Sequence, residues 1–152
     1  MSQRIGLALM SGATLTLAAL ALCGAPARAQ ESVHRIVAVV NDDVISNADM
    51  NARTRLVLVG SGLPDTPENA RRVLPQVLRS LIDERLQIQE AQRLGVSVTE
   101  TDFGQQVALI EENNRMARGG IYQMLAQNRI PRATFDAQVR TSLVWQKLAL
   151  RK

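Results

Sequence analysis

Cysteine and aromatic residues are scarce in this sequence, and their scarcity excludes several classes of protein. The 152 residues include one cysteine, Cys23, and four aromatic side chains. A single cysteine supports neither a disulfide scaffold nor a cysteine-based zinc module. Four rings are also too few for an aromatic-rich core or for a surface that stacks nucleic-acid bases.

A strong charge of either sign is missing as well. The chain has 18 basic and 14 acidic residues, a net charge of +4, and two of the basic residues lie within the first 29. This excess is too small to predict a nucleic-acid partner. With 46% hydrophobic and 21% charged residues, the composition is that of a globular protein rather than a disordered one.

The first 29 residues have the pattern of a secretory signal peptide. Arg4 precedes an uncharged stretch over residues 5–22 that is rich in leucine and alanine. The small residues Ala27 and Ala29 then form the motif that signal peptidase recognises. We therefore expect cleavage between Ala29 and Gln30, with no stable membrane insertion of the mature chain.

Two alternatives for this leader are less favoured. An uncleaved anchor would need a more apolar stretch, because 18 residues barely cross a bilayer and several of these are polar or glycine. Lipidation of Cys23 would need a small residue before it, where Leu22 stands. After cleavage, residues 30–152 would contain no cysteine and would suit an oxidising compartment.

Residues 35–46 predict a short β-hairpin that leads into a helix. A β-branched apolar run is followed by the turn residues Asn41-Asp42-Asp43, after which the apolar pattern resumes. Ser46 has the character of a helix N-cap, and Asp49 lies at the third helical position, as in a capping box. This pattern predicts a helix from residue 47 to about residue 59.

Start and stop signals divide the remaining sequence into further helices. Thr66 with Pro67 and Thr99 with Asp102 are typical helix starts, and Gly95 is a typical terminator. Pro75 either kinks one long helix or begins its second half. The expected helices after the first therefore cover about residues 67–94, 100–114, 121–128 and 131–148.

The sequence thus predicts a mainly α fold, with a short N-terminal β-hairpin followed by about five helices. Apolar residues at helical spacing indicate which face of each helix is buried. In the last helix we expect that face to carry Phe135, Val139, Leu143, Trp145 and Leu148.

The sequence contains no recognisable catalytic or metal-binding motif. The acidic pairs Asp83/Glu84 and Glu111/Glu112 are sequence neighbours that point about 100° apart on a helix, so we interpret them as solvated surface. His34, the single histidine, has no second ligand at metal spacing, and no glycine-rich phosphate loop is present. We therefore expect no catalytic residue, no metal and no cofactor.

Three segments of the sequence resemble a known family. Residues 35–46 combine a basic residue, an apolar strand ending in Val-Val-Asn, a turn and Val-Ile-Ser before a helix, and residues 94–99 read Leu-Gly-Val-Ser-Val-Thr. Together with Leu-x-x-Leu-Ile-Asp-Glu-Arg-Leu over residues 78–86, they resemble the SurA N-terminal domain family. The resemblance covers about residues 34–152 and implies that residues 30–152 form a helical chaperone domain.

The resemblance also implies a function. The family comprises periplasmic chaperones that hold unfolded outer-membrane proteins without ATP. Its members continue into parvulin-type prolyl isomerase domains, which usually carry a pair of histidines. This sequence stops at Lys152 and has His34 alone, so we expect no isomerase activity from it.

The same comparison with the family predicts where a client would bind. The family packs a C-terminal closing helix on this domain, and this sequence does not include one, so we expect an exposed apolar groove. On the last two helices, Tyr122, Met124, Phe135 and Trp145 are the side chains that we expect to border it. Methionine and aromatic residues at helical spacing also suit core positions.

Two other functions stay open at this point. The chain could be the N-terminal piece of a parvulin-type peptidyl-prolyl isomerase, which an assay on a prolyl peptide would reveal. It could also be an envelope assembly protein that pairs with a partner helix, for which a stable dimer without affinity for unfolded protein would be diagnostic. Nothing in the sequence predicts an oligomeric state.

Overall fold

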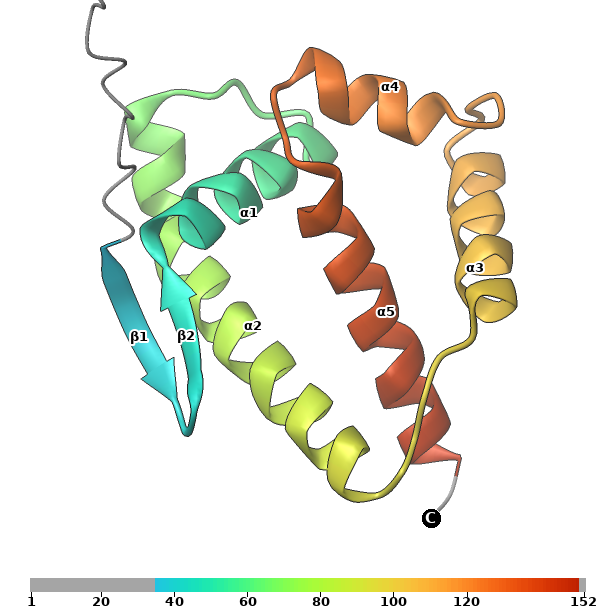
Figure 1. The fold of residues 1–152 in the computed structure, drawn as a ribbon. Coiled ribbons are helices and arrows are strands. Elements are labelled where there is room, and N and C mark those ends of the chain that lie inside the picture. Colours follow the sequence, from blue (N-terminus) through green and yellow to red (C-terminus); the bar gives the residue numbers. More distant parts are fainter. Residues whose placement is uncertain (1–34, 151–152) are drawn as a thin grey trace, which may run out of the picture. The chain divides into compact units, whose positions relative to one another are not determined.

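A computed structural model of the chain describes residues 35–150. The expected signal peptide, with its cleavage site between Ala29 and Gln30, lies outside these residues, as do Cys23 and His34. Within the described part, a two-stranded hairpin is followed by five helices (Figure 1). The predicted fold class is therefore confirmed.

The hairpin pairs β1 (Ile36–Val40) with β2 (Asp43–Ser46) in antiparallel register. Asn41 adopts the left-handed conformation, with φ of 54°, which an asparagine in a tight turn tolerates better than most residues. Val40 and the β2 residue Ile45 are buried, whereas neighbouring positions face outward. Since two strands alone are marginally stable, the hairpin depends on the helices that its inner face contacts.

The first helix, α1 (Asn47–Gly60), begins at a complete capping box. The Ser46 hydroxyl accepts a hydrogen bond from the Asp49 backbone N–H at 3.1 Å, and the Asp49 carboxylate accepts one from the Ser46 N–H at 2.9 Å. Two backbone donors that the helix cannot satisfy are thereby paired, as the sequence predicts.

The second helix, α2 (Pro67–Arg93), is continuous through Pro75. The sequence allowed Pro75 either to lie inside one long helix or to begin a second one. The second alternative is wrong, because α2 continues on both sides of Pro75. Pro75 lacks the N–H that would bond to the carbonyl of Arg71, so the helix gives up one internal hydrogen bond. Val77 and Leu81, just beyond it, are buried, which indicates that packing holds the helix together across this point.

The remaining helices are α3 (Glu100–Asn113), α4 (Gly120–Gln127) and α5 (Arg132–Ala149). Helix α3 begins at a second complete capping box, formed by Thr99 and Asp102. The N-cap residue of α4 is Gly119, which has no side chain that could cap the helix. The predicted boundaries agree with the observed ones to within one or two residues.

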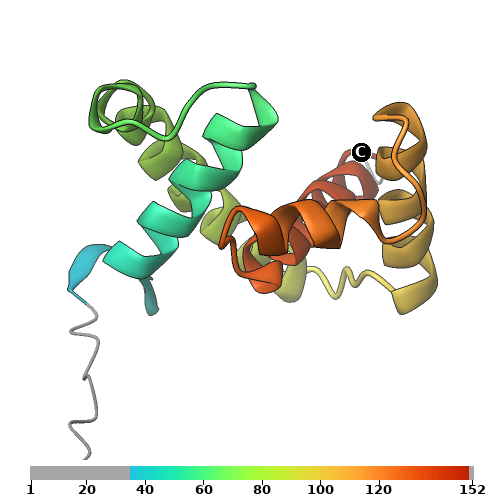
Figure 2. The ribbon, with the colours of Figure 1, turned by 90° about the horizontal axis from the view of Figure 1, so that it is seen from above.

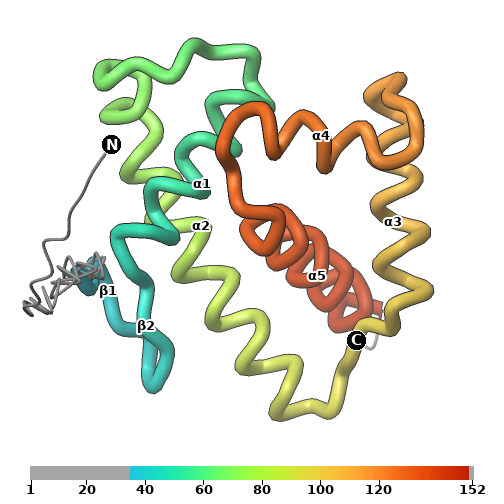
Figure 3. The backbone as a smooth tube through the Cα atoms, turned by 45° about the horizontal axis from the view of Figure 1, so that its top comes forward, coloured from blue at the N-terminus to red at the C-terminus, as the bar shows by residue number. Residues whose placement is uncertain are grey.

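Helix α5 lies between α2 and α3, and α4 lies across the end at which α5 begins (Figures 1 and 3). Seen from above, the hairpin, α1 and most of α2 lie on one side of α5, with α3 on the other (Figure 2). No helix in the described part is long and apolar enough to cross a membrane.

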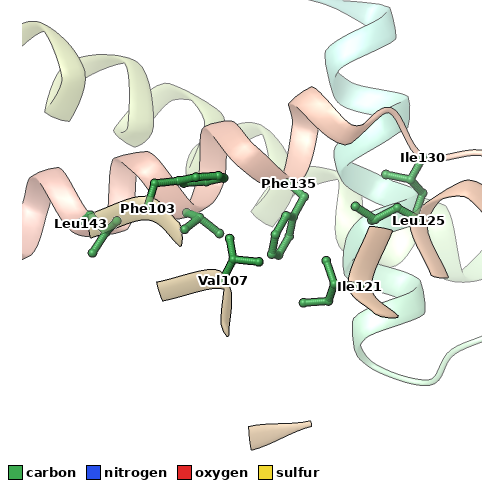
Figure 4. Packing of buried hydrophobic residues seen from close by; sticks show 8 residues of the cluster. Phe103, Val107, Ile121, Leu125, Ile130, Phe135 and Leu143 are labelled. Carbon is green, nitrogen blue, oxygen red and sulfur yellow. The ribbon is translucent and has the colours of Figure 1, made fainter. Parts of the chain in front are cut away.

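Two main clusters of buried side chains form the core. The first joins the hairpin to α1 and α2 and consists of Val40, Ile45, Met50, Val77 and Leu81. The second joins α3, α4 and α5 and consists of Phe103, Val107, Ile121, Leu125, Ile130, Phe135, Val139 and Leu143 (Figure 4). A smaller cluster connects the end of α2 with α5 through Ala91, Val96, Val144 and Leu148.

The buried face of α5 differs from the prediction at one residue. Trp145 is 53% exposed and belongs to no core cluster, whereas Val144 is buried. Two residues along a helix correspond to a rotation of about 200°, so Trp145 points away from the face that carries Leu143. The prediction that Trp145 shares the apolar face of α5 is therefore wrong.

An ion pair connects the first turn of α3 to the last turn of α5. Lys147 Nζ lies 2.6 Å from Asp102 Oδ2 and donates a hydrogen bond to the carbonyl oxygen of Ser97 at 3.0 Å. The hydrogen bond from Lys147, together with those from Thr99, lowers the pKa of Asp102 from 3.8 to about 2. The pair therefore joins two helices that are distant in the sequence.

Replacing Asp102 with asparagine is expected to lower the midpoint of thermal unfolding slightly at pH 7, because the pair is partly exposed to solvent. The folded-state pKa is lowered, so this stabilisation is complete above about pH 4 and is lost as the pH falls toward 2. Calorimetry of the wild type and the variant between pH 7 and pH 2 measures the difference. A difference that persists unchanged at pH 2 would contradict this assignment.

Candidate functional site

An apolar groove lies between α1, α3, α4 and α5 and has a volume of about 560 Å³. Most of its apolar lining comes from Leu56, Val59, Ile110, Met116, Met124 and Phe135. Its polar lining consists of amides and hydroxyls, including Gln106, Asn114, Gln138 and Ser142. None of the described residues that line it is charged. We call this site the apolar groove.

Two methionines give the apolar groove an adaptable surface. Met116 lies in the segment between α3 and α4, and Met124 lies on α4, with both side chains partly exposed. Methionine is unbranched and has a polarisable thioether, so it can fit apolar partners of different shapes. The groove is therefore suited to contacts with varied apolar side chains.

The position of α4 in the groove depends on a buried carboxylate. Glu111 of α3 is 4% exposed, and its Oε1 accepts a hydrogen bond from the Ile121 backbone N–H at 3.3 Å. Ile121 lies in the first turn of α4, where unpaired N–H groups and the helix dipole favour a negative charge. Glu111 thus provides the cap that Gly119 cannot provide.

A second, partly buried carboxylate fixes α1 against α2. The Arg53 guanidinium donates two hydrogen bonds to the Glu84 carboxylate, at 2.6 and 2.8 Å. The side chain of Arg53 is 4% exposed and that of Glu84 is 18% exposed. Because α1 supplies Leu56 and Val59 to the apolar groove, this pair also holds one wall of the groove in place.

The interpretation of the acidic pairs as solvated surface is therefore wrong for Glu84 and Glu111. Each pair still diverges as expected, since Asp83 and Glu112 face solvent. Glu111 follows Val107 by four residues on the apolar face of its helix, and Glu84 follows Leu81 by three. This helical spacing is the sequence signal that places both carboxylates on an apolar face. A carboxylate on such a face needs a hydrogen-bonding or charged partner.

Three of the four side chains expected to border a groove lie close together. Met124 and Phe135 line the apolar groove. Tyr122 packs edge-on against Phe135, with ring centroids 6.1 Å apart and an angle of 88°. Its hydroxyl donates a hydrogen bond to Asp136 Oδ1 at 3.1 Å, and the Arg132 guanidinium lies 3.7 Å from its ring centre.

Tyr122 is a supporting residue rather than part of the groove surface. Burial raises the pKa of its hydroxyl, an effect that the neighbouring Arg132 opposes. The fourth expected residue, Trp145, does not line the apolar groove. It lies in a separate hollow between α2 and α5, which also includes Asp83.

The arrangement of the described residues suits binding rather than proton transfer. The lining of the apolar groove includes no titratable side chain in this part of the chain. Residues 35–150 also contain no group of three histidine, cysteine or acidic residues that could hold a metal ion. What the groove offers is apolar contact area with a rim of uncharged hydrogen-bonding groups.

Comparison with known proteins gives a consistent result. The sequence model of the SurA N-terminal domain matches residues 33–149. A protein named Chaperone SurA from Pseudomonas savastanoi pv. phaseolicola is 32% identical over 141 residues, which cover 90% of this chain and 32% of that protein. Chaperone SurA of Chromobacterium violaceum is 31% identical over 125 residues, covering 82% of this chain and 29% of that protein. The chain spans about a third of the length of these relatives.

Proposed function

Because this chain belongs to the SurA N-terminal domain family, we propose that it acts as a chaperone module that holds unfolded polypeptides in the apolar groove. The observation that carries this proposal is the uncharged, methionine-containing lining of the groove. An unfolded chain exposes apolar side chains that water solvates poorly, and the groove can cover them. The surrounding amides and hydroxyls can pair with the polar backbone of the same segment.

Holding of this kind needs no ATP. Each apolar side chain that enters the groove contributes on the order of 1 kcal/mol, so a client is retained by several weak contacts and dissociates readily. When the client folds elsewhere, mass action draws it off the chaperone. The same weak contacts allow one groove to accept many sequences.

We further propose that the clients are outer-membrane proteins and that the chaperone works in the periplasm. The strands of a membrane β-barrel alternate apolar and polar residues, so the unfolded chain presents apolar side chains at every second position. A cleaved signal peptide over residues 1–29 would deliver the chain to the compartment that such clients cross. The mature domain would then comprise residues 30–152.

The proposal predicts that the purified chain suppresses aggregation of an unfolded outer-membrane protein. A small β-barrel protein is unfolded in urea and diluted into buffer without ATP, and aggregation is followed by light scattering. Scattering is expected to fall progressively as the chain is added up to a fewfold molar excess. Unchanged scattering at a large excess would refute the chaperone proposal.

We also propose that this chain does not catalyse prolyl isomerisation. No titratable group lines the groove in the described part, and the described residues include no histidine. A protease-coupled assay on a prolyl peptide should therefore give the uncatalysed rate in the presence of the chain. Acceleration that scales with the concentration of the chain would favour the isomerase alternative instead.

A further inference from the structure

Trp145, the single tryptophan of the chain, lies in a polar hollow and not in the core. The hollow lies between α2 and α5 and has a volume of about 440 Å³. Asp83, Glu84 and Gln87 of α2 line it opposite the indole. Trp145 is 53% exposed as a residue, so its side chain is accessible to a partner. We call this site the tryptophan hollow.

The tryptophan hollow carries an uncompensated negative charge. No described lysine or arginine lines it, although the chain contains 18 basic residues. The charge of Glu84 is matched by its two hydrogen bonds to Arg53. Asp83 is exposed and forms no ion pair within residues 35–150. The hollow therefore presents an aromatic ring and one unmatched carboxylate.

At two other places in this chain, an arginine lies between an aromatic ring and a carboxylate. The Arg132 guanidinium lies 3.7 Å from the ring centre of Tyr122 and 3.5 Å from the Asp136 carboxylate. In the same way, Arg140 stacks on Phe103 at 4.2 Å while it pairs with Glu100 at 2.9 Å. In both places a guanidinium is shared between an aromatic face and a carboxylate, an arrangement that both partners favour.

We propose that Trp145 and Asp83 bind an arginine or lysine side chain of the polypeptide held in the apolar groove. The cation stacks on the indole and pairs with the carboxylate, so it completes the arrangement already present at Tyr122 and Phe103. This inference rests on the proposed chaperone function, since the cation belongs to the client. It adds a preference for basic residues to a site that otherwise selects apolar ones.

The geometry of α5 allows one client segment to occupy both sites. Gln138 and Ser142 line the apolar groove and also the tryptophan hollow, so the two sites adjoin along this helix. From Gln138 to Trp145 the helix rises about 10 Å, since each residue adds about 1.5 Å. An extended chain covers that distance in about three residues, at about 3.3 Å per residue. The preferred segment therefore has a basic residue about three positions from an apolar one.

The test compares two fluorescein-labelled peptides that differ in one side chain. Both are short, unstructured and rich in leucine, and one carries arginine three positions from a leucine, where the other carries citrulline. Citrulline has nearly the same shape without the charge. Fluorescence anisotropy with the full chain gives a dissociation constant for each peptide. The arginine peptide is expected to bind roughly fivefold more tightly.

Variants of residues in the tryptophan hollow test whether these residues cause the difference in affinity between the two peptides. Asp83→Asn and Trp145→Leu should each bring the two affinities together, while Trp145→Phe, which retains a ring, should keep part of the difference. Glu112→Gln is the matched control, because it removes an exposed carboxylate outside both sites, and it should leave the fivefold ratio intact. Since Asp83 and Trp145 are exposed, these variants are expected to fold.

The outcomes separate this inference from the chaperone proposal. Equal binding of both peptides to the wild type would overturn the basic-residue site and leave the apolar groove standing. A charge preference that survives in Asp83→Asn would also overturn it, because the preference would then arise elsewhere. Failure of both peptides to bind would refute peptide binding by the groove and, with it, the inference that depends on it.

Discussion

Replacing Glu84 with glutamine is expected to lower the free energy of unfolding by about 3 kcal/mol, since breaking a buried ion pair leaves an uncompensated charge. Arg53 is almost fully buried, and its guanidinium bonds to both carboxylate oxygens of Glu84. Glutamine retains one acceptor but removes the opposing charge from a cation that cannot lose its proton. Urea unfolding followed by far-UV circular dichroism measures the change.

Two further variants distinguish charge from packing at this site. Glu68→Gln removes an exposed partner of Arg72 and should change stability by less than about 0.5 kcal/mol. The double variant Arg53→Met/Glu84→Leu should recover most of the loss, because apolar side chains of similar size can replace a buried pair. If Glu84→Gln were no more destabilising than Glu68→Gln, the pair would not hold α1 on α2 as inferred.

The Arg53–Glu84 pair also has a consequence for binding. It fixes α1 on α2, and α1 contributes Leu56 and Val59 to the apolar groove. A chain that loses the pair should remain folded at low temperature but hold this wall of the groove less firmly. Glu84 does not line the apolar groove, although it does line the tryptophan hollow. Weaker binding by Glu84→Gln of a leucine-rich peptide that carries no basic residue would therefore follow from the displaced wall.

Replacing Met124 with glutamate should weaken binding of an unfolded client at least tenfold. A carboxylate in the lining of the apolar groove would have to lose its hydration when an apolar client side chain arrives, and that loss costs several kcal/mol. Met124 is partly exposed at the groove surface, so the empty groove can accommodate the charge in water. The fall in affinity is measured by anisotropy of a labelled client and, independently, by light scattering.

Leu86→Glu is the matched control for the groove variant. Leu86 is 46% exposed on α2 and lines neither the apolar groove nor the tryptophan hollow. Leu86→Glu makes the same change from an apolar side chain to a carboxylate, and it should leave the affinity for the client within about twofold of the wild-type value. Equal loss in both variants would mean that net charge, not the groove, governs binding. Met124→Leu, which keeps the site apolar, should bind nearly as well as the wild type.

The candidate site was predictable only in part. The residue types of Met124 on α4 and Phe135 on α5 predict a groove position for both, and both line the groove. The sequence does not predict the other wall, because Leu56 and Val59 belong to α1, more than sixty residues earlier in the chain than Met124. The prediction for Trp145 is wrong because this residue follows Leu143 by two positions, and two positions rotate a side chain by about 200° to the opposite face of α5.

Local signals in the sequence determined where the elements begin and end. The capping boxes at Ser46 and Thr99 are complete in the structure, and Gly95 has the left-handed φ of 63° that ends α2. These features form between residues at most a few positions apart, so their free energies depend little on the rest of the chain. The family resemblance relied on the same segments and was confirmed by the match over residues 33–149.

Tertiary packing alone decided what is buried and what is open. The continuity of α2 through Pro75, the burial of Glu111, the pairing of Glu84 with buried Arg53, and the exposure of Trp145 all depend on partners on other elements. Arg53 and Glu84, for example, are 31 positions apart and meet only because α1 lies against α2. Whether a side chain is buried depends on which helix faces pack together. A local sequence pattern identifies the apolar face of each helix, but it does not identify the helix that packs on that face.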